Sequence, residues 1–307
     1  MTFYEAEPPT RDALPGDSAA ASLDLVGLTP LMNRTSGRSD LAVGLIDGPV
    51  DTGRPEFEAG NICEVAPTAP AVCKHPESHS CRHGTFVAGM LAGRRGSGAL
   101  AICPGCTLLV RPIFAEAAPG HGPMPTSRPE SLAEAIRAVI DAGALIINIS
   151  ADLRWSSVRE YEVLTQALDD ASRRGVIVVA AAGNQGIVGS SALTRHPSVV
   201  PVAACDVRGQ LLSYSNLGAT MASRGLRAPG EGIVSLETGG RLLPVGGTSV
   251  SAPLVTGAIA LLWSLFPTAS ASRIHHALLN TALRGRMVAP PLLDAWGAHG
   301  RLAAATC

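Results

Sequence analysis

Three side chains that together support nucleophilic catalysis stand at the ends of predicted elements, far apart along the chain. Asp47 closes an apolar strand, His83 opens a run of small residues, and Ser249 opens a long apolar run. A serine hydroxyl is a weak nucleophile near neutral pH, so it needs a histidine to accept its proton. A buried carboxylate then fixes the tautomer of that histidine. The chemistry expected of this set is attack by the Ser249 oxygen on a carbonyl carbon.

The surroundings of Ser249 favour the same chemistry. The residue lies in Gly246-Gly247-Thr248-Ser249-Val250-Ser251-Ala252-Pro253, just before the apolar run from Leu254 to Leu265. Apolarity on all sides predicts a buried helix, and the first turn of a helix presents backbone N–H groups and the positive end of the dipole. These groups would stabilise an oxyanion beside the hydroxyl. The alternative is that Thr248 or Ser249 only caps the helix.

Asn184 supplies a fourth group, because it follows a strand expected at 176–181. Its side-chain amide can donate to a developing oxyanion together with the backbone N–H of Ser249. The chain order Asp, His, Ser is one of the known orders of a catalytic triad. Asp51 is a second acidic candidate, but Asp47 ends the strand, and we expect Asp51 to cap the turn that follows.

The elements that must position these residues alternate between strand and helix. This alternation predicts an α/β fold with a doubly wound, mostly parallel sheet and helices on both faces. We expect a flexible N-terminal arm at 1–20 and a single folded domain at 21–307. The predicted strands are 41–46, 108–114, 144–149, 176–181, 199–204, 226–228 and 233–236. The predicted helices are 22–32, 83–92, 130–142, 157–174, the serine helix through 265, and 271–283.

Composition limits the possible partners. The chain has 307 residues, of which 46% are hydrophobic and 16% charged, so it can bury a large core. The net charge of −1 offers no basic surface for nucleic acid. The first 20 residues contain no apolar signal core, and the run 254–265 is too short to span a bilayer. We therefore expect a cytoplasmic protein with no nucleic-acid or membrane partner, and its oligomeric state stays open.

The seven cysteines are an odd number, so at least one has no partner within the chain. Cys103 and Cys106 flank a Pro-Gly turn and could close a small disulfide, although a reducing compartment favours free thiols. Other potential ligands gather before His83, and their spacing matches no zinc pattern: Cys63, Cys73, His75, His79 and Cys81. We expect no metal and no cofactor, and favour a local disulfide among Cys63, Cys73 and Cys81.

The chain resembles the subtilisin-like serine proteases from about Ser22 to Ala305. The matching motifs come in order at predicted element ends: Leu45-Ile46-Asp47-Gly48, His83-Gly84-Thr85, Ile147-Asn148-Ile149-Ser150, Ala181-Ala182-Gly183-Asn184 and Gly247-Thr248-Ser249-Val250-Ser251-Ala252-Pro253. The resemblance implies a serine endopeptidase. Ser249 would be its nucleophile, His83 its general base, Asp47 the residue that orients His83, and Asn184 an oxyanion donor.

Substrate contacts are also implied by this resemblance. The edge of strand 144–149 and its continuation would pair with an extended peptide, and the segment before Asn184 would wall the specificity pocket. The residues concerned are Ile149, Ser150, Ala151, Asp152, Ala181, Ala182 and Gly183. Asp152 could select a basic side chain or simply be solvated. Phe86 departs from the histidine common in secreted subtilisins, and Arg94 and Arg95 stand where those proteins bind calcium, so we expect no calcium there.

A narrower likeness is to the cyanobactin-maturation branch, whose members cut ribosomal precursor peptides. It is carried by Asp47-Gly48-Pro49-Val50-Asp51, Cys103-Pro104-Gly105-Cys106, Arg111-Pro112-Ile113-Phe114 and Ala228-Pro229-Gly230-Glu231. Macrocyclases of this branch carry a helical insertion near the cleft. The segment between Asp47 and His83 has no room for one, so we expect hydrolysis of a leader or recognition segment. The alternatives are a cytoplasmic protease of broad specificity and a catalytically dead peptide-binding protein.

Overall fold

Seven parallel strands form the central sheet of this computed structural model, which describes residues 15–57, 60–65, 73–116, 127–150, 158–279 and 289–305. The strand order is β2-β3-β1-β4-β5-β6-β7, and β8 and β9 form a separate antiparallel hairpin. The bounds are β1 (Ala42–Asp47), β2 (Ile62–Glu64), β3 (Thr107–Pro112), β4 (Ala144–Ile149), β5 (Ile177–Ala181), β6 (Val199–Cys205), β7 (Leu226–Pro229), β8 (Ile233–Leu236) and β9 (Leu242–Val245).

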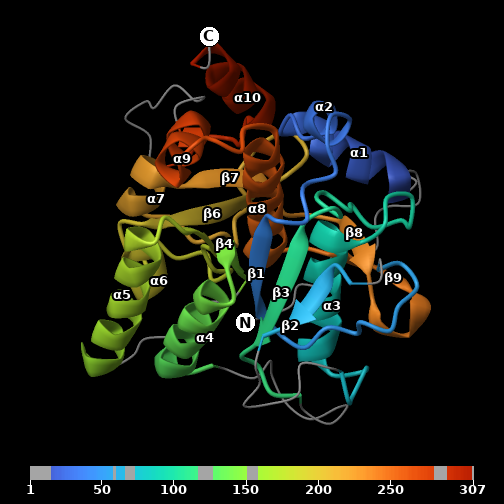
Figure 1. Cartoon of the computed structure of the whole chain (residues 1–307), viewed down its shortest axis with the longest axis horizontal. Coiled ribbons are helices and arrows are strands. Elements are labelled where there is room, and N and C mark those ends of the chain that lie inside the picture. The colour runs from blue at the N-terminus through green and yellow to red at the C-terminus, as the bar shows by residue number, and fades with distance from the viewer. Residues whose placement is uncertain are drawn as a thin grey trace.

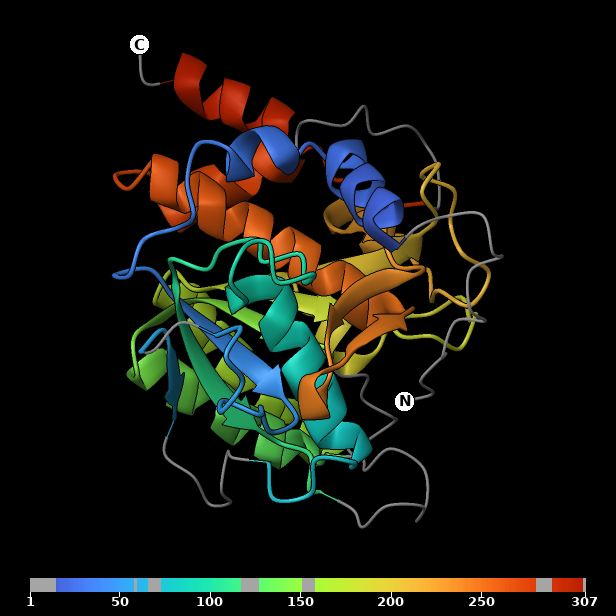
Figure 2. The same cartoon turned by 90° about the vertical axis from the view of Figure 1, so that its right-hand side faces the viewer.

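The central strands are largely apolar because helices cover both faces of the sheet, and Asp47 in β1 and Asn148 in β4 are polar exceptions. Alternate residues of β5 face opposite layers: Val178 and Ala180 join the cluster under α4 (Pro129–Asp141) and α5 (Val158–Arg173). Val179 and Ala181 join the cluster under α3 (His79–Ala92) and α8 (Thr248–Leu265). Figures 1 and 2 show these two helical layers on either side of the strands. The predicted doubly wound α/β fold is confirmed.

The serine helix is longer than the apolar run that predicted it. α8 begins at Thr248 and has 18 residues. Among the described residues it is the one helix long and apolar enough to cross a membrane, and 94% of it is buried inside the structure. The argument that this helix is too short for a bilayer was therefore wrong, because the first turn around Ser249 is helical too. Its apolar surface packs in the core, against β4, β5, β6 and β7.

Several further elements differ from the prediction, among them α1 (Pro15–Leu25), β2 and α10 (Ala295–Ala304). α1 begins inside the predicted arm, because proline at the first position and the alanines after it favour a helix; residues 1–14 lie outside the described part. β2 lies in a segment for which neither a strand nor a helix was predicted. α10 was not predicted, and the Asp294 side chain caps it by accepting the Gly297 N–H at 2.8 Å.

The remaining helices are short or partly described. They are α2 (Thr29–Met32), α6 (Ala192–Arg195), α7 (Ala219–Arg224), the 3₁₀ turn η1 (Thr238–Gly240) and α9 (Ala271–Leu279). The predicted helix 271–283 corresponds to α9, and its last predicted residues fall in 280–288, outside the described part.

Candidate active site

Asp47 and His83 form a buried hydrogen-bonded pair. Nδ1 of His83 lies 2.6 Å from Oδ1 of Asp47, and the two side chains are 1% and 0% exposed. The same carboxylate oxygen accepts the backbone N–H of Gly48 at 2.6 Å. Because a carboxylate can only accept, His83 must donate from Nδ1, which leaves Nε2 of the neutral ring as the acceptor. A general base that takes a proton from serine needs this tautomer.

The place of His83 follows from the way α3 packs against the end of β1. An added Cβ at Gly84 would lie 2.4 Å from the carbonyl oxygens of both Gly48 and Pro49, in the turn after β1. Only glycine allows such a close approach of helix and backbone. The residue after His83 therefore sets the separation between α3 and the strand end that carries Asp47.

Asp51, the second acidic candidate, lies outside this pair. Its backbone N–H donates to Oγ1 of Thr85 at 2.9 Å. Its carboxylate turns toward Gly53, where an added Cβ would lie 3.6 Å from Oδ1 of Asp51. The residue is partly exposed, whereas Asp47 is buried. The acid that contacts His83 is therefore the one that ends the strand.

The sheet register brings Ser249 to the same edge. β1 and β4 are parallel neighbours, with Ile46 opposite Ile149. The residues that follow, Asp47 and Ser150, therefore come at the same carboxyl edge of adjacent strands. The hydroxyl of Ser150 donates to the backbone carbonyl oxygen of Ser249 at 3.1 Å. Ser249, in the first turn of α8 and 4% exposed, is thus anchored at the strand next to Asp47.

Asn184 lies beside Ser249 with its amide in a fixed orientation. Its Oδ1 accepts the backbone N–H of Thr248 at 2.9 Å and the Thr248 hydroxyl at 3.0 Å. A Cβ placed on Gly247 would lie 3.0 Å from the other amide atom, Nδ2, and 3.5 Å from Oγ of Ser249. Gly247 has a φ of 131°, which favours glycine, and a side chain at this position would crowd the Asn184 amide. An oxyanion formed beside Oγ of Ser249 would have Nδ2 of Asn184 and the backbone N–H of Ser249 as its donors.

We expect Asn184→Ala to lower kcat by about 10²- to 10³-fold, the range measured for such an amide donor in subtilisin. KM should change little, because the amide meets charge that develops only in the transition state. Steady-state hydrolysis of a chromogenic peptide checks this, with thermal unfolding as a control for the lost bonds to Thr248. An unchanged kcat in a folded variant would show that Nδ2 does not serve the oxyanion.

The predicted contacts of strand 144–149 need a correction. β4 is paired on both sides, with β1 and with β5. Its edges therefore have no free backbone groups for an extended peptide, and the prediction that its edge binds substrate was wrong. Ile149 is buried at its end. Ala151 and Asp152 lie outside the described residues, so a substrate-binding role of this continuation stays a prediction.

Ala181, Ala182 and Gly183 connect β5 to Asn184 and are held by a residue that was not singled out from the sequence. The side chain of Asn216 donates to the carbonyl oxygen of Ala182 at 3.1 Å, and its backbone N–H donates to that of Gly183 at 2.9 Å. Both alanines are only 2% exposed. The segment fixes the place of Asn184, and its role in substrate binding stays a prediction.

Glu237 is a second residue that was not singled out from the sequence, because no local pattern marks it. It is 3% exposed and follows β8. Its carboxylate forms ion pairs with Arg82 at 2.5 Å and with Arg241 at 3.2 Å, and its backbone carbonyl accepts a hydrogen bond from Arg54. Since Arg82 directly precedes His83, Glu237 ties the start of α3 to the β8–β9 hairpin.

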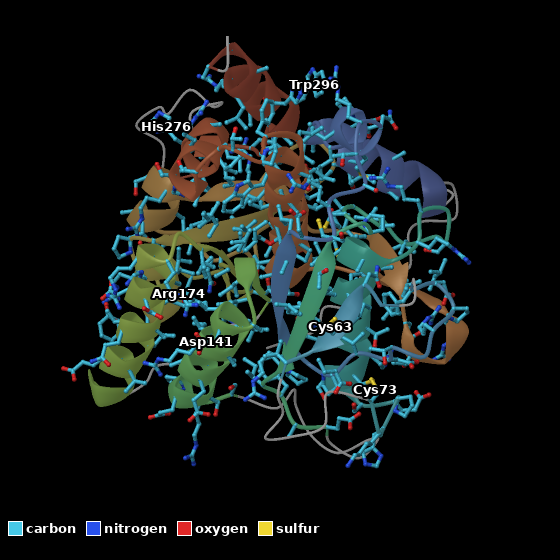
Figure 3. All side chains as sticks on the ribbon, in the orientation of Figure 1. Cys63, Cys73, Asp141, Arg174, His276 and Trp296 are labelled. Carbon is cyan, nitrogen blue, oxygen red and sulfur yellow. A yellow bond between two sulfur atoms is a disulfide. The ribbon has the colours of Figure 1, made fainter. Side chains whose placement is uncertain are left out.

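We expect Glu237→Ala to lower the free energy of unfolding by about 2 to 3 kcal/mol, because it removes the buried carboxylate that both Arg82 and Arg241 contact. The matched control is Asp141→Ala, which breaks an exposed ion pair with Arg174 at 2.6 Å between the ends of α4 and α5 (Figure 3). That change should cost less than about 1 kcal/mol. Urea unfolding measures both, and equal losses would contradict a structural role for Glu237.

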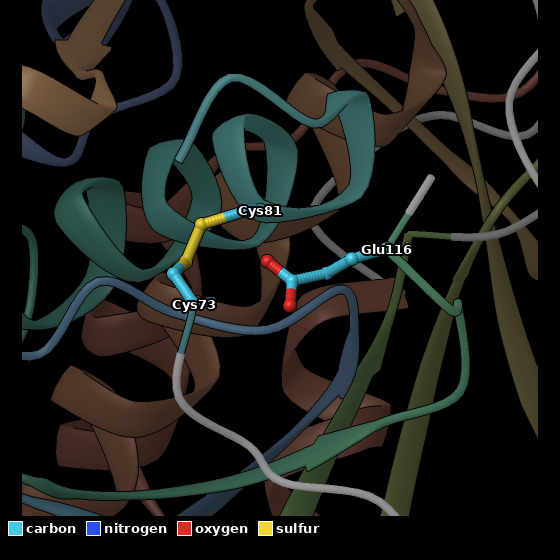
Figure 4. Close-up of side chains that lie close together, drawn as sticks. All are labelled: Cys73, Cys81 and Glu116. Atoms are coloured by element: carbon cyan, nitrogen blue, oxygen red, sulfur yellow. A yellow bond between two sulfur atoms is a disulfide. The ribbon is translucent and has the colours of Figure 1, made fainter. Parts of the chain in front are cut away.

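A disulfide lies next to the candidate site. It joins Cys73 to Cys81 in the first turn of α3 (Figure 4). Glu116 holds the same segment by accepting the backbone N–H groups of Lys74 at 3.0 Å and His75 at 2.9 Å. The pairing falls within the set of cysteines in which a local disulfide was favoured.

The same cluster is the place where a metal was considered. The donor atoms of Cys73, Cys81 and Glu116 lie within 4.8 Å of one another. Zinc binds cysteine as a thiolate, and sulfurs joined to each other are not thiolates. The cluster therefore does not offer a thiolate site in this state, and the absence of a metal stays a prediction.

The other described cysteines are free. Cys63 in β2 is exposed (Figure 3), and Cys103, Cys106 and Cys205 are buried. The hydrogen bond between Cys103 and Cys106 raises the pKa of the first thiol and lowers the pKa of the second. Burial raises the pKa of Cys205 to about 12. The Cys103–Cys106 turn thus carries two thiols, and the small disulfide considered for it is not formed.

The fold and these contacts define a class: α/β proteins that bring an aspartate, a histidine and a serine at a helix N-terminus to one edge of a parallel sheet. The model of the subtilase family matches residues 38–299, and the chain belongs to this family. The thermostable alkaline protease of Halalkalibacterium halodurans is 31% identical over 220 residues, which cover 71% of this chain and 57% of that protein. The chain thus matches little more than half of that relative's length.

Two solved structures share the fold over nearly their whole length. A mutant of the protease domain of PatA is 31% identical with a TM-score of 0.77, covering 88% of this chain and 97% of that one. The prenylagaramide maturation protease PagA is 27% identical with a TM-score of 0.76, covering 90% of this chain and 98% of that one. The resemblance to the cyanobactin-maturation branch is confirmed.

Proposed function

We propose that the chain is a serine endopeptidase that hydrolyses peptide bonds with Ser249, His83 and Asp47. The observation that carries this proposal is the buried bond of 2.6 Å between His83 Nδ1 and Asp47, at the sheet edge where Ser249 is anchored. That bond prepares Nε2 of His83 to accept a proton. A purely structural role for a buried Asp–His pair would not require an oriented amide such as that of Asn184 beside Ser249.

In the proposed reaction, Ser249 Oγ attacks the scissile carbonyl carbon while its proton passes to Nε2 of His83. Asp47 stabilises the imidazolium that results, and the oxyanion is held by Asn184 Nδ2 and the Ser249 N–H. His83 then gives the proton to the leaving amine as the C–N bond breaks. Water, deprotonated by the same histidine, hydrolyses the acyl-enzyme and restores the serine.

The proposed substrate is the precursor peptide of a ribosomally made natural product, from which the enzyme removes a leader or recognition segment. This rests on the likeness to PatA and PagA, whose names describe maturation proteases. A protease of broad specificity is the alternative. We also propose hydrolysis rather than macrocyclisation. The proposed location is the cytoplasm, where small-molecule thiols would tend to reduce the Cys73–Cys81 disulfide.

Labelling with a fluorophosphonate tests the activity, because the reagent reacts only with an activated serine. Mass spectrometry of a precursor peptide incubated with the protein tests the substrate: one cut that releases a linear leader supports the proposal. Many cuts in unfolded casein would favour broad specificity instead. A product lighter than the linear fragment by one water would show macrocyclisation. If the fluorophosphonate does not label the protein, the protein binds peptides without cleaving them.

A further inference from the structure

A buried chain of hydrogen bonds runs from the middle of α8 back to its first turn. Oγ1 of Thr256 lies 2.8 Å from Oδ1 of Asn148 in β4. Nδ2 of Asn148 lies 2.7 Å from Oγ of Ser150, which in turn lies 3.1 Å from the carbonyl oxygen of Ser249. Thr256, Asn148 and Ser150 are each 0% exposed. The chain therefore links the backbone of Ser249 to the sheet without contact with solvent.

Pro253 explains why the Ser249 carbonyl needs this outside donor. In an α-helix the carbonyl of residue i accepts the N–H of residue i+4. For Ser249 that residue is Pro253, which lies inside α8 and has no N–H. A buried carbonyl left without a donor is unfavourable, and Ser150 provides the bond that the helix cannot.

The direction of every bond in the chain is fixed by its end. The Ser249 carbonyl can only accept, so the Ser150 hydroxyl must donate to it. The Ser150 oxygen then accepts from Asn148, which requires Nδ2 on that side and Oδ1 on the other. Thr256 must therefore donate to Oδ1. Only this arrangement satisfies the side chains of Thr256, Asn148 and Ser150 together with the Ser249 carbonyl. Without the Thr256 hydroxyl, the Asn148 amide is no longer held in one orientation, and neither is the Ser150 hydroxyl that it contacts.

We propose that Thr256, Asn148 and Ser150 are positioning residues that hold the first turn of α8, and hence the Ser249 hydroxyl, in the orientation for attack. The inference rests on the proposed nucleophilic role of Ser249. Pro253 removes one hydrogen bond within the helix from this turn. The bond from Ser150 in the hydrogen-bond chain replaces it with a hydrogen bond from the end of β4. Thr256 lies two turns along α8 from Ser249, so it acts only through its neighbours.

The test compares Thr256→Val, which keeps the shape of the side chain but cannot donate, with Thr256→Ser, which keeps the hydroxyl. We expect Thr256→Val to slow both fluorophosphonate labelling and kcat by about 10- to 100-fold with KM unchanged, since small displacements of reacting groups have effects of this size. Thr256→Ser should restore most of both rates. The control is Ser264→Ala, which removes a buried hydroxyl that bonds the Ala260 carbonyl at 2.7 Å in the same helix, and should leave both rates unchanged.

The outcomes separate this proposal from the proposed function. Wild-type rates in folded Thr256→Val, or equally slow Val and Ser variants, would overturn the positioning role. If Thr256→Val does not fold, Ser150→Ala carries the same expectation. If the wild-type protein is not labelled, the proposed function fails. The hydrogen-bond chain can then still be tested by the ¹³C NMR chemical shift of the Ser249 carbonyl. This shift should change in Thr256→Val and stay the same in Ser264→Ala. An unmoved shift would overturn the hydrogen-bond chain.

Discussion

Ser249→Ala should lower kcat by about 10⁶-fold and abolish fluorophosphonate labelling, because removal of the nucleophile costs this much in a triad whose members act as a unit. The hydroxyl lies in the first turn of a buried helix, beside Gly247 and the Asn184 amide. Those donors remain in the variant, so a small residual activity above water should persist. Peptide hydrolysis and labelling followed by gel fluorescence measure the loss.

The matched control for this change is Ser251→Ala, two residues along the same helix. Ser251 is also fully buried, and its hydroxyl donates to the carbonyl oxygen of Pro229 at 3.1 Å. Its loss should affect stability rather than labelling. Labelling that survives in Ser249→Ala, or disappears equally in Ser251→Ala, would show that another residue is the nucleophile.

Asp47→Asn should lower kcat by about 10⁴-fold near neutral pH, the size of the effect when the acid of a triad becomes an amide. If the amide oxygen keeps its bonds to His83 and Gly48, the imidazolium loses its negative partner. If the amide nitrogen faces His83 instead, Nδ1 must accept, and Nε2 then carries the proton and cannot act as a base. Neither orientation supports catalysis, because Asp47 and His83 are buried and no solvent can replace the lost carboxylate.

Asp51→Asn is the control for this second prediction. It removes one negative charge four residues away, at a turn where Asp51 uses its backbone N–H to bond Thr85. We expect kcat within a few-fold of the wild type. Equal losses in the two variants would mean that charge near β1, rather than the bond to His83, supports the activity.

Most of the fold was predictable because it depends on short-range patterns. Continuous apolar runs identified the strands that are covered on both faces, and alternation with helices identified the parallel sheet. α10 was missed because its apolar face is short and its cap depends on a single residue, Asp294. The length of α8 was underestimated in the bilayer argument because only the apolar run 254–265 was counted, whereas the helix begins at Thr248, next to the serine expected in its first turn.

By itself, the sequence determined which residue types stand at the ends of the strands and helices, because propensity and periodicity act over a few residues. It identified Asp47, His83, Asn184 and Ser249 as candidates in this way. Only the tertiary structure decided the contacts between distant segments. Strand order made β4 a central strand, and packing across the sheet set Glu237 against Arg82 and Ser150 against the Ser249 carbonyl. These contacts join residues that lie far apart in the chain, so no local pattern encodes them.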